Sequence, residues 1–229
     1  MINDSLGTPI NNSGLTDQVI DRITTALIHK ELKPGDKLPP ENELVMSLKV
    51  GRSSVREAIK VLQAMGIVQV KRGDGTYVAS KASGAAVNPM LYQLLLERGT
   101  MEDLVELRVM FEPAFVLLAA RKATEEDFKK IRAAQQHCEE LALQNKHTGE
   151  DDIAFHMAIL HATHNPYVIR IGEVILKMFM ESVSRSSSKS PTTVVEDHRR
   201  ICDALFCRDA VALNAAVLHS FQGWMEHQK

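Results

Sequence analysis

The sequence has few aromatic residues, few cysteines and no long apolar run, and each shortage excludes a class of protein. Phe, Trp and Tyr make up 5% of the 229 residues, which favours aliphatic packing between helices over an aromatic-rich β-sandwich. Cys138, Cys202 and Cys207 are odd in number and lack the paired spacing of zinc ribbons or disulfide frameworks. No stretch approaches the ~18 apolar residues of a membrane span, and the polar N-terminus lacks the basic-then-apolar order of a signal peptide. We therefore expect a cytoplasmic protein without membrane contact.

Charge is distributed unevenly, although the net charge is only −2. Residues 15–80 carry ten Lys and Arg against eight Asp and Glu, whereas the rest of the chain carries 17 against 21. A slightly basic segment on an acidic body is compatible with DNA contact confined to one end.

The pattern of apolar residues, glycines and prolines predicts a mainly α-helical protein of two domains. We expect a disordered arm over 1–14, a winged helix-turn-helix over 15–80, a linker over 81–89 and an all-helical antiparallel bundle over 90–229. In the first domain, helices are predicted over 15–31, 41–48 and 53–65, followed by a hairpin of 67–70 and 76–78. In the second, helices are predicted over 90–98, 100–122, 124–145, 150–163, 166–185, 191–207 and 209–227, with a loop over 184–190.

The third predicted helix has an apolar stripe and a separate basic face. Arg52, Arg56 and Lys60 recur every four residues, and such a face could enter the major groove of DNA. A solvated helix face would show the same spacing. The order of short helix, turn, helix and hairpin, with Lys71 and Arg72 in the hairpin turn, favours DNA binding.

The run from Leu32 to Ser80 resembles the DNA-binding domain of the GntR family of transcription regulators. The matching motifs are Pro-Gly-x-x-Leu-Pro, Ser-x-x-Val-Arg-Glu-Ala and the wing Gly-x-Gly-Thr-Tyr-Val. The resemblance implies contact with double-stranded operator DNA by Arg52, Ser53, Ser54, Arg56, Lys60, Lys71, Arg72 and Gly75. Asn42 is a departure, because family members often have arginine at this position.

The second half resembles the FCD domain of the FadR-type branch of that family. The resemblance depends on Glu-Leu-Arg at 106–108 with Glu112, on Asp-Ile-Ala-Phe-His at 152–156, and on later residues. These are Asn165, Asp-His-Arg at 197–199, and His219.

The chemistry of these residues suggests a metal site. Asp152 and His156 share an apolar helix face, and His198 lies on an apolar stripe, while His219 lies among small alanines. A single inward histidine is usually a hydrogen-bonded core residue, but the set of four matches the family pattern. We predict that Asp152, His156, His198 and His219 bind a divalent ion, with Zn²⁺, Ni²⁺ and Mn²⁺ as candidates.

Arg108 is a candidate effector-binding residue, because it falls among apolar residues on its helix. An internal salt bridge to Glu112 is one interpretation. The other, implied by the resemblance, is a bidentate clamp on a ligand carboxylate. With a metal beside it, the ligand would be a hydroxy acid, a sugar acid or a dicarboxylate.

The sequence thus predicts a homodimeric repressor, not an enzyme, that is released from its operator by a small carboxylic acid. A metal-dependent hydrolase or lyase that uses Asp152 and the histidines is an alternative, but no nucleophile accompanies these residues. Another alternative keeps the DNA-binding domain and makes the helical domain and its metal purely structural.

Overall fold

The computed structural model describes residues 14–80, 89–183 and 190–226, which contain ten helices and two strands. The chain divides into two compact units, Met1–Pro89 and Met90–Lys229. The predicted fold class, mainly α with one small hairpin, is confirmed. The predicted arm and linker lie outside the described residues, apart from Gly14 and Pro89, which belong to helices. The predicted loop over 184–190 also lies outside them, except for Ser190.

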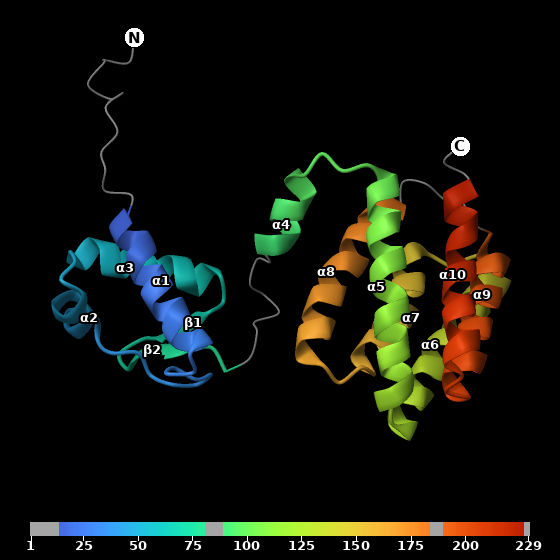
Figure 1. Ribbon diagram of the computed structural model, residues 1–229, viewed down its shortest axis with the longest axis horizontal. Coiled ribbons are helices and arrows are strands. Elements are labelled where there is room, and N and C mark those ends of the chain that lie inside the picture. Colours follow the sequence, from blue (N-terminus) through green and yellow to red (C-terminus); the bar gives the residue numbers. More distant parts are fainter. Residues whose placement is uncertain (1–13, 81–88, 184–189, 227–229) are drawn as a thin grey trace, which may run out of the picture. The chain divides into compact units, whose positions relative to one another are not determined.

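The first unit is a three-helix cluster with a β-hairpin (Figure 1). Its elements are α1 (Gly14–Ile28), α2 (Glu41–Leu48), α3 (Arg52–Ala64), β1 (Val68–Lys71) and β2 (Gly75–Val78). Val19 and Ile23 of α1 pack in one core with Val55, Ile59 and Leu62 of α3. These apolar positions follow the helical repeat, so the opposite face of α3 remains in solvent.

The hairpin pairs β1 with β2 in antiparallel register, from Val68 opposite Val78 to Lys71 opposite Gly75. Gly73 and Gly75 have φ of 78° and 148°, in the region that residues with a Cβ rarely adopt. The chain around Leu38 runs along the free edge of β2, where its N–H donates to the carbonyl of Thr76 at 2.8 Å. The wing is therefore anchored to the body of the unit.

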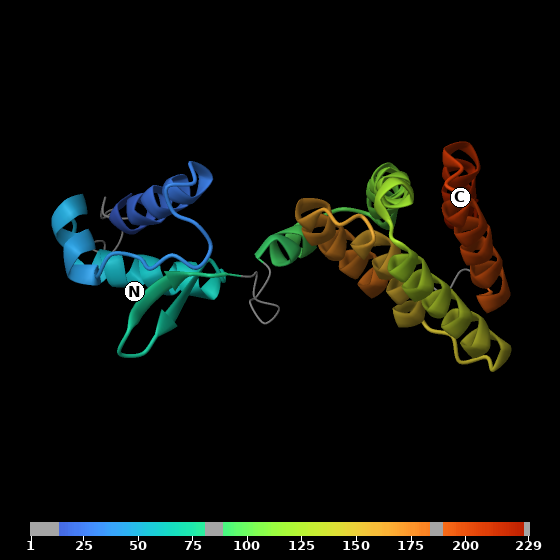
Figure 2. The same cartoon turned by 90° about the horizontal axis from the view of Figure 1, so that it is seen from below.

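The second unit is a helical bundle (Figures 1 and 2). Its helices are α4 (Pro89–Leu96), α5 (Met101–Lys122), α6 (Glu125–Leu143), α7 (Gly149–His161), α8 (Pro166–Val183), α9 (Pro191–Phe206) and α10 (Ala210–Glu226). The long helix α5 packs against α7, α8, α9 and α10. In Figure 2 it is seen almost end on, between α8 and α10.

Local sequence explains where these helices begin. Thr100 and Asp103 form a capping box at the start of α5, and Thr124 and Asp127 form another at the start of α6. The carboxylate of Asp209 accepts hydrogen bonds of 3.0 Å from two backbone N–H groups at the start of α10. The two capping boxes and Asp209 all provide acceptors for backbone N–H groups that the first helical turn leaves unpaired.

Helix α8 approaches its neighbours most closely at Gly172. A Cβ at this position would lie 2.6 Å from Leu160 of α7 and 3.1 Å from Phe111 of α5. The absence of a side chain therefore allows α8 to lie close to α7 and α5 at this point.

Among the described residues, no helix combines the length and apolar character needed to span a membrane.

Candidate functional site

The exposed face of α3 carries the basic residues that the sequence assigns to DNA. Arg52, Arg56 and Lys60 are exposed, whereas Val55 and Ile59 on the other side are buried. Helix-turn-helix proteins insert the helix after the turn into the major groove of DNA, where cations on one face can contact the bases and phosphates. The basic face of α3 has this arrangement.

The remaining predicted DNA contacts lie at the start of α3 and on the wing. Ser53 is exposed and Ser54 is half-buried. Lys71 and Arg72 are exposed on the hairpin, and Gly75 begins β2.

Asn42 contacts the first residue of α3. Nη2 of Arg52 donates a hydrogen bond of 3.1 Å to Oδ1 of Asn42, and both side chains are exposed. The amide therefore orients this guanidinium without neutralising its charge.

The wing also has a polar cluster that the sequence did not single out. Nζ of Lys37 lies 2.9 Å from a carboxylate oxygen of Asp74, and the hydroxyl of Tyr77 donates to the other oxygen at 2.8 Å. These hydrogen bonds, from Lys37 first, hold the pKa of Asp74 below its usual value. Lys71 lies 4.3 Å from the centre of the Tyr77 ring. The Gly-Thr-Tyr-Val motif was the available signal for Tyr77, whereas Lys37 comes from a distant turn.

In the second unit, three of the four predicted metal ligands meet. One candidate ligand atom from each of Asp152, His156 and His198 lies within 4.8 Å of the others. Oδ1 of Asp152 is 3.0 Å from Nε2 of His198 and 3.8 Å from Nε2 of His156. Two donors that bind one ion at about 2.1 Å can be at most about 4.2 Å apart. Both separations satisfy that limit, and all three candidate atoms lie within 4.8 Å of one another, so these residues could hold a divalent cation.

The surroundings of the cluster favour the protonation states that bind a metal. Burial lowers the pKa of His198, although the hydrogen bond to Asp152 opposes this effect. Burial alone would raise the pKa of Asp152, but the hydrogen bond from His198 and nearby positive charge lower it overall. A neutral imidazole and an ionised carboxylate are the forms that coordinate. The His198 ring also stacks on Phe155 at 3.9 Å, which fixes its orientation.

Buried Glu112 links this cluster to Arg108. Its Oε2 accepts a hydrogen bond of 2.6 Å from Nε of Arg108, and its Oε1 lies 2.6 Å from Nδ1 of His156. The second contact is short but is not a hydrogen bond, and neither of these two buried atoms has another hydrogen-bond partner. Burial would raise the pKa of Glu112, but the charges of Arg108 and His156 lower it to about 2.

Two aromatic rings pack against the guanidinium of Arg108, in addition to the hydrogen bond at its Nε. It lies 4.2 Å from the ring centre of Phe179 and 5.3 Å from that of Phe221. Its Nη1 and Nη2 have no protein partner among residues 14–80, 89–183 and 190–226. The predicted pairing of Arg108 with Glu112 is therefore present, whereas its contact with a ligand stays a prediction.

The structure does not bring His219 to the other three predicted ligands. Its side chain is 47% exposed, and its Nε2 lies 3.8 Å from Asp197. Over residues 210–221 of α10, the part whose burial is described, the buried residues are Leu213, Val217 and Phe221, so His219 lies on another face. The neighbouring alanines suggested an inward position, but Ala212 and Ala215 are exposed and line a surface hollow with His219. An alanine-rich helix gives a weak signal of which face is buried.

Family models match both units. The model described as "Bacterial regulatory proteins, gntR family" matches residues 15–78, and the FCD domain model matches residues 103–223. The chain belongs to the GntR family.

The chain matches transcription regulators over most of its own length and of theirs. It is 31% identical to the HTH-type transcriptional regulator LutR of Bacillus subtilis, over 82% of this chain and 89% of the relative. It is 29% identical to the putative L-lactate dehydrogenase operon regulatory protein of Escherichia coli, over 89% and 82%. It is 27% identical to the galactonate operon transcriptional repressor of E. coli, over 89% and 92%.

A solved structure has the same architecture. The GntR protein of Streptococcus agalactiae superposes with a TM-score of 0.68 at 27% identity, over 93% of this chain and 99% of that one. The GntR-family chain is thus a DNA-binding transcription regulator with an FCD domain.

Proposed function

We propose that this protein is a repressor that leaves its operator when a small carboxylic acid binds at a metal site in the FCD domain. Arg52, Ser53, Ser54, Arg56 and Lys60 would contact the operator from α3, and Lys71, Arg72 and Gly75 from the wing. Two subunits would bind the half-sites of a short palindrome. The function is regulatory and involves no turnover of the acid.

The free nitrogens of Arg108 carry the proposal. Because Glu112 occupies Nε, the guanidinium cannot rotate away, and Nη1 with Nη2 can bind both oxygens of one carboxylate. The rings of Phe179 and Phe221 hold the guanidinium plane. A largely buried arginine whose two terminal nitrogens have no protein partner in the described ranges can bind an anionic ligand there.

The ligand cluster supplies the second contact. A divalent cation held by Asp152, His156 and His198 would offer open coordination positions to a further oxygen of the acid. The charge of Arg108 acts on the Asp152 carboxylate, so the clamp and the cluster belong to one electrostatic network. A hydroxy acid, sugar acid or dicarboxylate has oxygens for both contacts. The names of two relatives, which mention L-lactate and galactonate, support this class.

Effector binding can act on DNA only through different affinities for two arrangements of the protein, a coupling of typically ~1–3 kcal/mol. Arg108 on α5 and His156 on α7 both contact Glu112, so a ligand that engages Arg108 also acts on the packing of these helices.

The test uses full-length protein loaded with Zn²⁺, Ni²⁺ or Mn²⁺ and a duplex selected from a random library. L-lactate, D-galactonate and a dicarboxylate are titrated into the complex, with lactamide as the uncharged control. We expect one acid to weaken DNA binding by about 10- to 100-fold. An acid that binds without changing DNA affinity would refute the coupling.

The variant Arg108→Ala separates the sensor from the structural-scaffold alternative. The sensor predicts that the variant binds DNA but ignores the acid. An unchanged response in the variant would favour the scaffold. Chemical conversion of an acid by the metal-loaded protein would favour the alternative of a metal-dependent hydrolase or lyase.

A further inference from the structure

The turn of the wing places a carboxylate beside residues that are proposed to contact DNA. Asp74 follows Arg72 and Gly73 in the chain, and its backbone N–H donates to the carbonyl of Lys71 at 3.1 Å. Its side chain is 51% exposed. Because a carboxylate repels the phosphates of DNA, this position is unfavourable for operator binding unless its charge is compensated.

Two donors compensate the charge of Asp74, one at each carboxylate oxygen. Nζ of Lys37 lies 2.9 Å from Oδ1, and the hydroxyl of Tyr77 donates to Oδ2 at 2.8 Å. Nζ of Lys71 lies 4.3 Å from the centre of the Tyr77 ring, and Nζ of Lys37 lies 5.4 Å from it. Two ammonium groups and a phenol hydroxyl therefore gather around one anion.

Glycine at position 75 allows Lys37 to reach the turn. A Cβ on Gly75 would lie 2.6 Å from Cε of Lys37 and 3.4 Å from its Nζ. The backbone before Lys37 is attached to the wing separately, because the N–H of Val78 donates to the carbonyl of Asp36 at 2.8 Å. Replacement of the Lys37 side chain therefore leaves that attachment in place.

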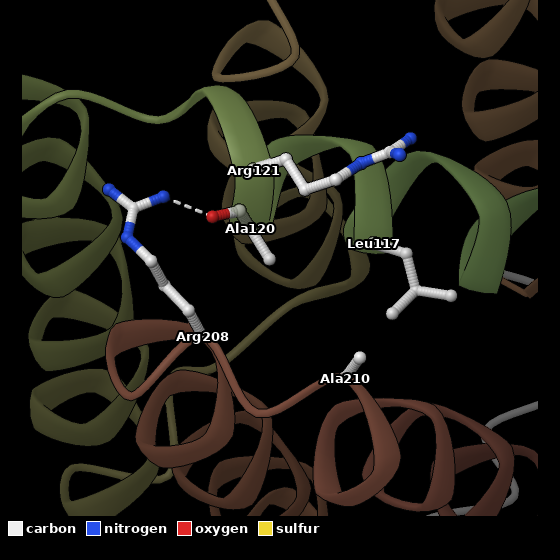
Figure 3. Close-up of a pocket in the computed structure, with 5 residues that line it drawn as sticks. All are labelled: Leu117, Ala120, Arg121, Arg208 and Ala210. Atoms are coloured by element: carbon white, nitrogen blue, oxygen red, sulfur yellow. Dashed lines mark hydrogen bonds between the residues drawn. The ribbon is translucent and has the colours of Figure 1, made fainter.

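Arg208 in the second unit shows how a cation is held when its partners are fixed. Figure 3 shows Arg208, in the turn before α10, bonded to the carbonyl of Ala120, and its other terminal nitrogen donates to the carbonyl of Ala123 at 2.9 Å. These acceptors are main-chain atoms at the end of α5 and cannot turn away. The partner of Lys37 is an exposed side chain that can turn away, and an exposed ion pair contributes little stability.

We propose that Lys37, Tyr77 and Lys71 form a binding site for a backbone phosphate of the operator, and that Asp74 occupies this site in the free protein. A phosphodiester has two free oxygens that can replace those of the carboxylate, and Lys and Tyr side chains are common phosphate donors. Asp74 competes with a phosphate of any sequence, so it lowers the affinity for all DNA. The inference deepens the DNA contacts of the proposed function and rests on them.

Removal of the competing charge tests whether Asp74 occupies the site. Fluorescence anisotropy measures binding of the full-length protein to the selected duplex and to a scrambled one. We expect Asp74→Asn to tighten binding to both about two- to fivefold, the range that an exposed ion pair can supply. Asp21→Asn, at an exposed site on α1, removes the same charge from the same unit and should have little effect. Equal gains in both variants, or no gain from Asp74→Asn, would overturn the proposal.

A double substitution separates a phosphate contact from a mere support for Asp74. In the Asp74→Asn background, Lys37→Met should still weaken binding about tenfold at about 0.1 M salt, because one phosphate contact is lost. The slope of log affinity against log salt should fall by about 1. Lys130→Met, at an exposed site on α6, is the matched control. If Lys37 only held Asp74, its replacement would change nothing in this background, and the proposal would be wrong.

Two conservative variants test the groups individually. Lys37→Arg keeps the charge and should bind within about threefold of the wild type. Tyr77→Phe removes only the hydroxyl, so it should weaken binding without a change in the salt slope. Thermal unfolding shows that each wing variant is folded. A loss in Lys37→Arg as large as that in Lys37→Met, or full binding by Tyr77→Phe, would contradict the assigned roles.

Failure of this site and failure of the proposed function give different results. If only the site is wrong, the wild-type protein still binds the selected duplex and one of the acids still releases it. If the proposed function is wrong, no acid releases the DNA, whatever the wing variants show.

Discussion

Oε1 of Glu112 lies 2.6 Å from Nδ1 of His156, and both side chains are buried. This contact joins α5 to α7, because the other oxygen of Glu112 holds Arg108. A carboxylate beside the ring nitrogen that faces away from a metal orients the imidazole and raises its basicity. Glu112 therefore contacts both Arg108 and one residue of the ligand cluster.

Replacement of Glu112 by glutamine should weaken metal binding while the fold survives. Gln keeps the shape but removes the charge that orients His156, and loss of such a partner typically lowers metal affinity about 10- to 100-fold. Calorimetric titration with Zn²⁺ measures the change. Glu140→Gln, at an exposed site on α6, is the control; equal affinities in both variants would contradict the role.

The ligand set can be tested residue by residue. Asp152→Asn and His198→Ala should each abolish metal retention, because both side chains belong to the cluster. His219→Ala should retain the metal, because this side chain is half-exposed beside Asp197. Elemental analysis of the purified variants gives the answer. Loss of metal from His219→Ala would restore the set of four predicted from the sequence.

Asp127 should contribute a pH-dependent part of the stability. Burial would raise its pKa, but hydrogen bonds from Thr124 and His164 lower the pKa from 3.8 to about 2. A lowered pKa stabilises the fold above pH 3.8, and this contribution is lost as the pH falls through about 2. Asp127→Asn should cost about 1 kcal/mol at pH 7, after solvent screening, and less near pH 2. Denaturant unfolding at both pH values measures the difference, and a constant penalty would contradict it.

The wing and α3 should differ in how they affect DNA binding. Lys71→Ala should weaken binding to all sequences and lower the slope of log affinity against log salt by about 1, because it would remove the proposed contact with a phosphate. Arg56→Ala should relax the preference at particular bases. Fluorescence anisotropy with the selected duplex and a scrambled one separates the two effects. An unchanged salt slope for Lys71→Ala would remove the wing from the interface.

The residue at position 42 should affect how strongly Arg52 binds DNA. The variant Asn42→Asp would replace a neutral acceptor with an anion at the site of the 3.1 Å hydrogen bond. We expect weaker operator binding, since the new ion pair competes with the DNA for the guanidinium. Asn42→Ala should have the smaller effect, and the same anisotropy measurement compares them. Stronger binding by the aspartate variant would contradict this.

The sequence predicted most of the fold because its apolar repeats are strong and its breaks are clear. The stripe of Val55, Ile59 and Leu62 identified the buried face of α3, and the structure confirms it. The wing also lies where the Gly-rich turn indicated, with β1 starting one residue later than expected.

The candidate site was predicted less completely, because periodicity weakens where a helix is apolar on all sides. Helix α10 has small or apolar residues around most of its circumference, so the orientation of His219 could not be derived from spacing. The sequence also could not predict that Glu112 contacts both Arg108 and His156. Its pairing with Arg108 follows from a spacing of four, but its approach to His156 depends on how α5 packs against α7.

Gly172 limits how this regulator can change over evolutionary time. The terminal carbons of the buried Leu160 side chain lie only 2.6 Å and 2.7 Å from the place a Cβ would occupy, so even alanine requires this side chain to shift. Deep mutational scanning should therefore find that residues larger than alanine are poorly tolerated at position 172. Tolerated replacements there should occur only together with a smaller residue at Leu160.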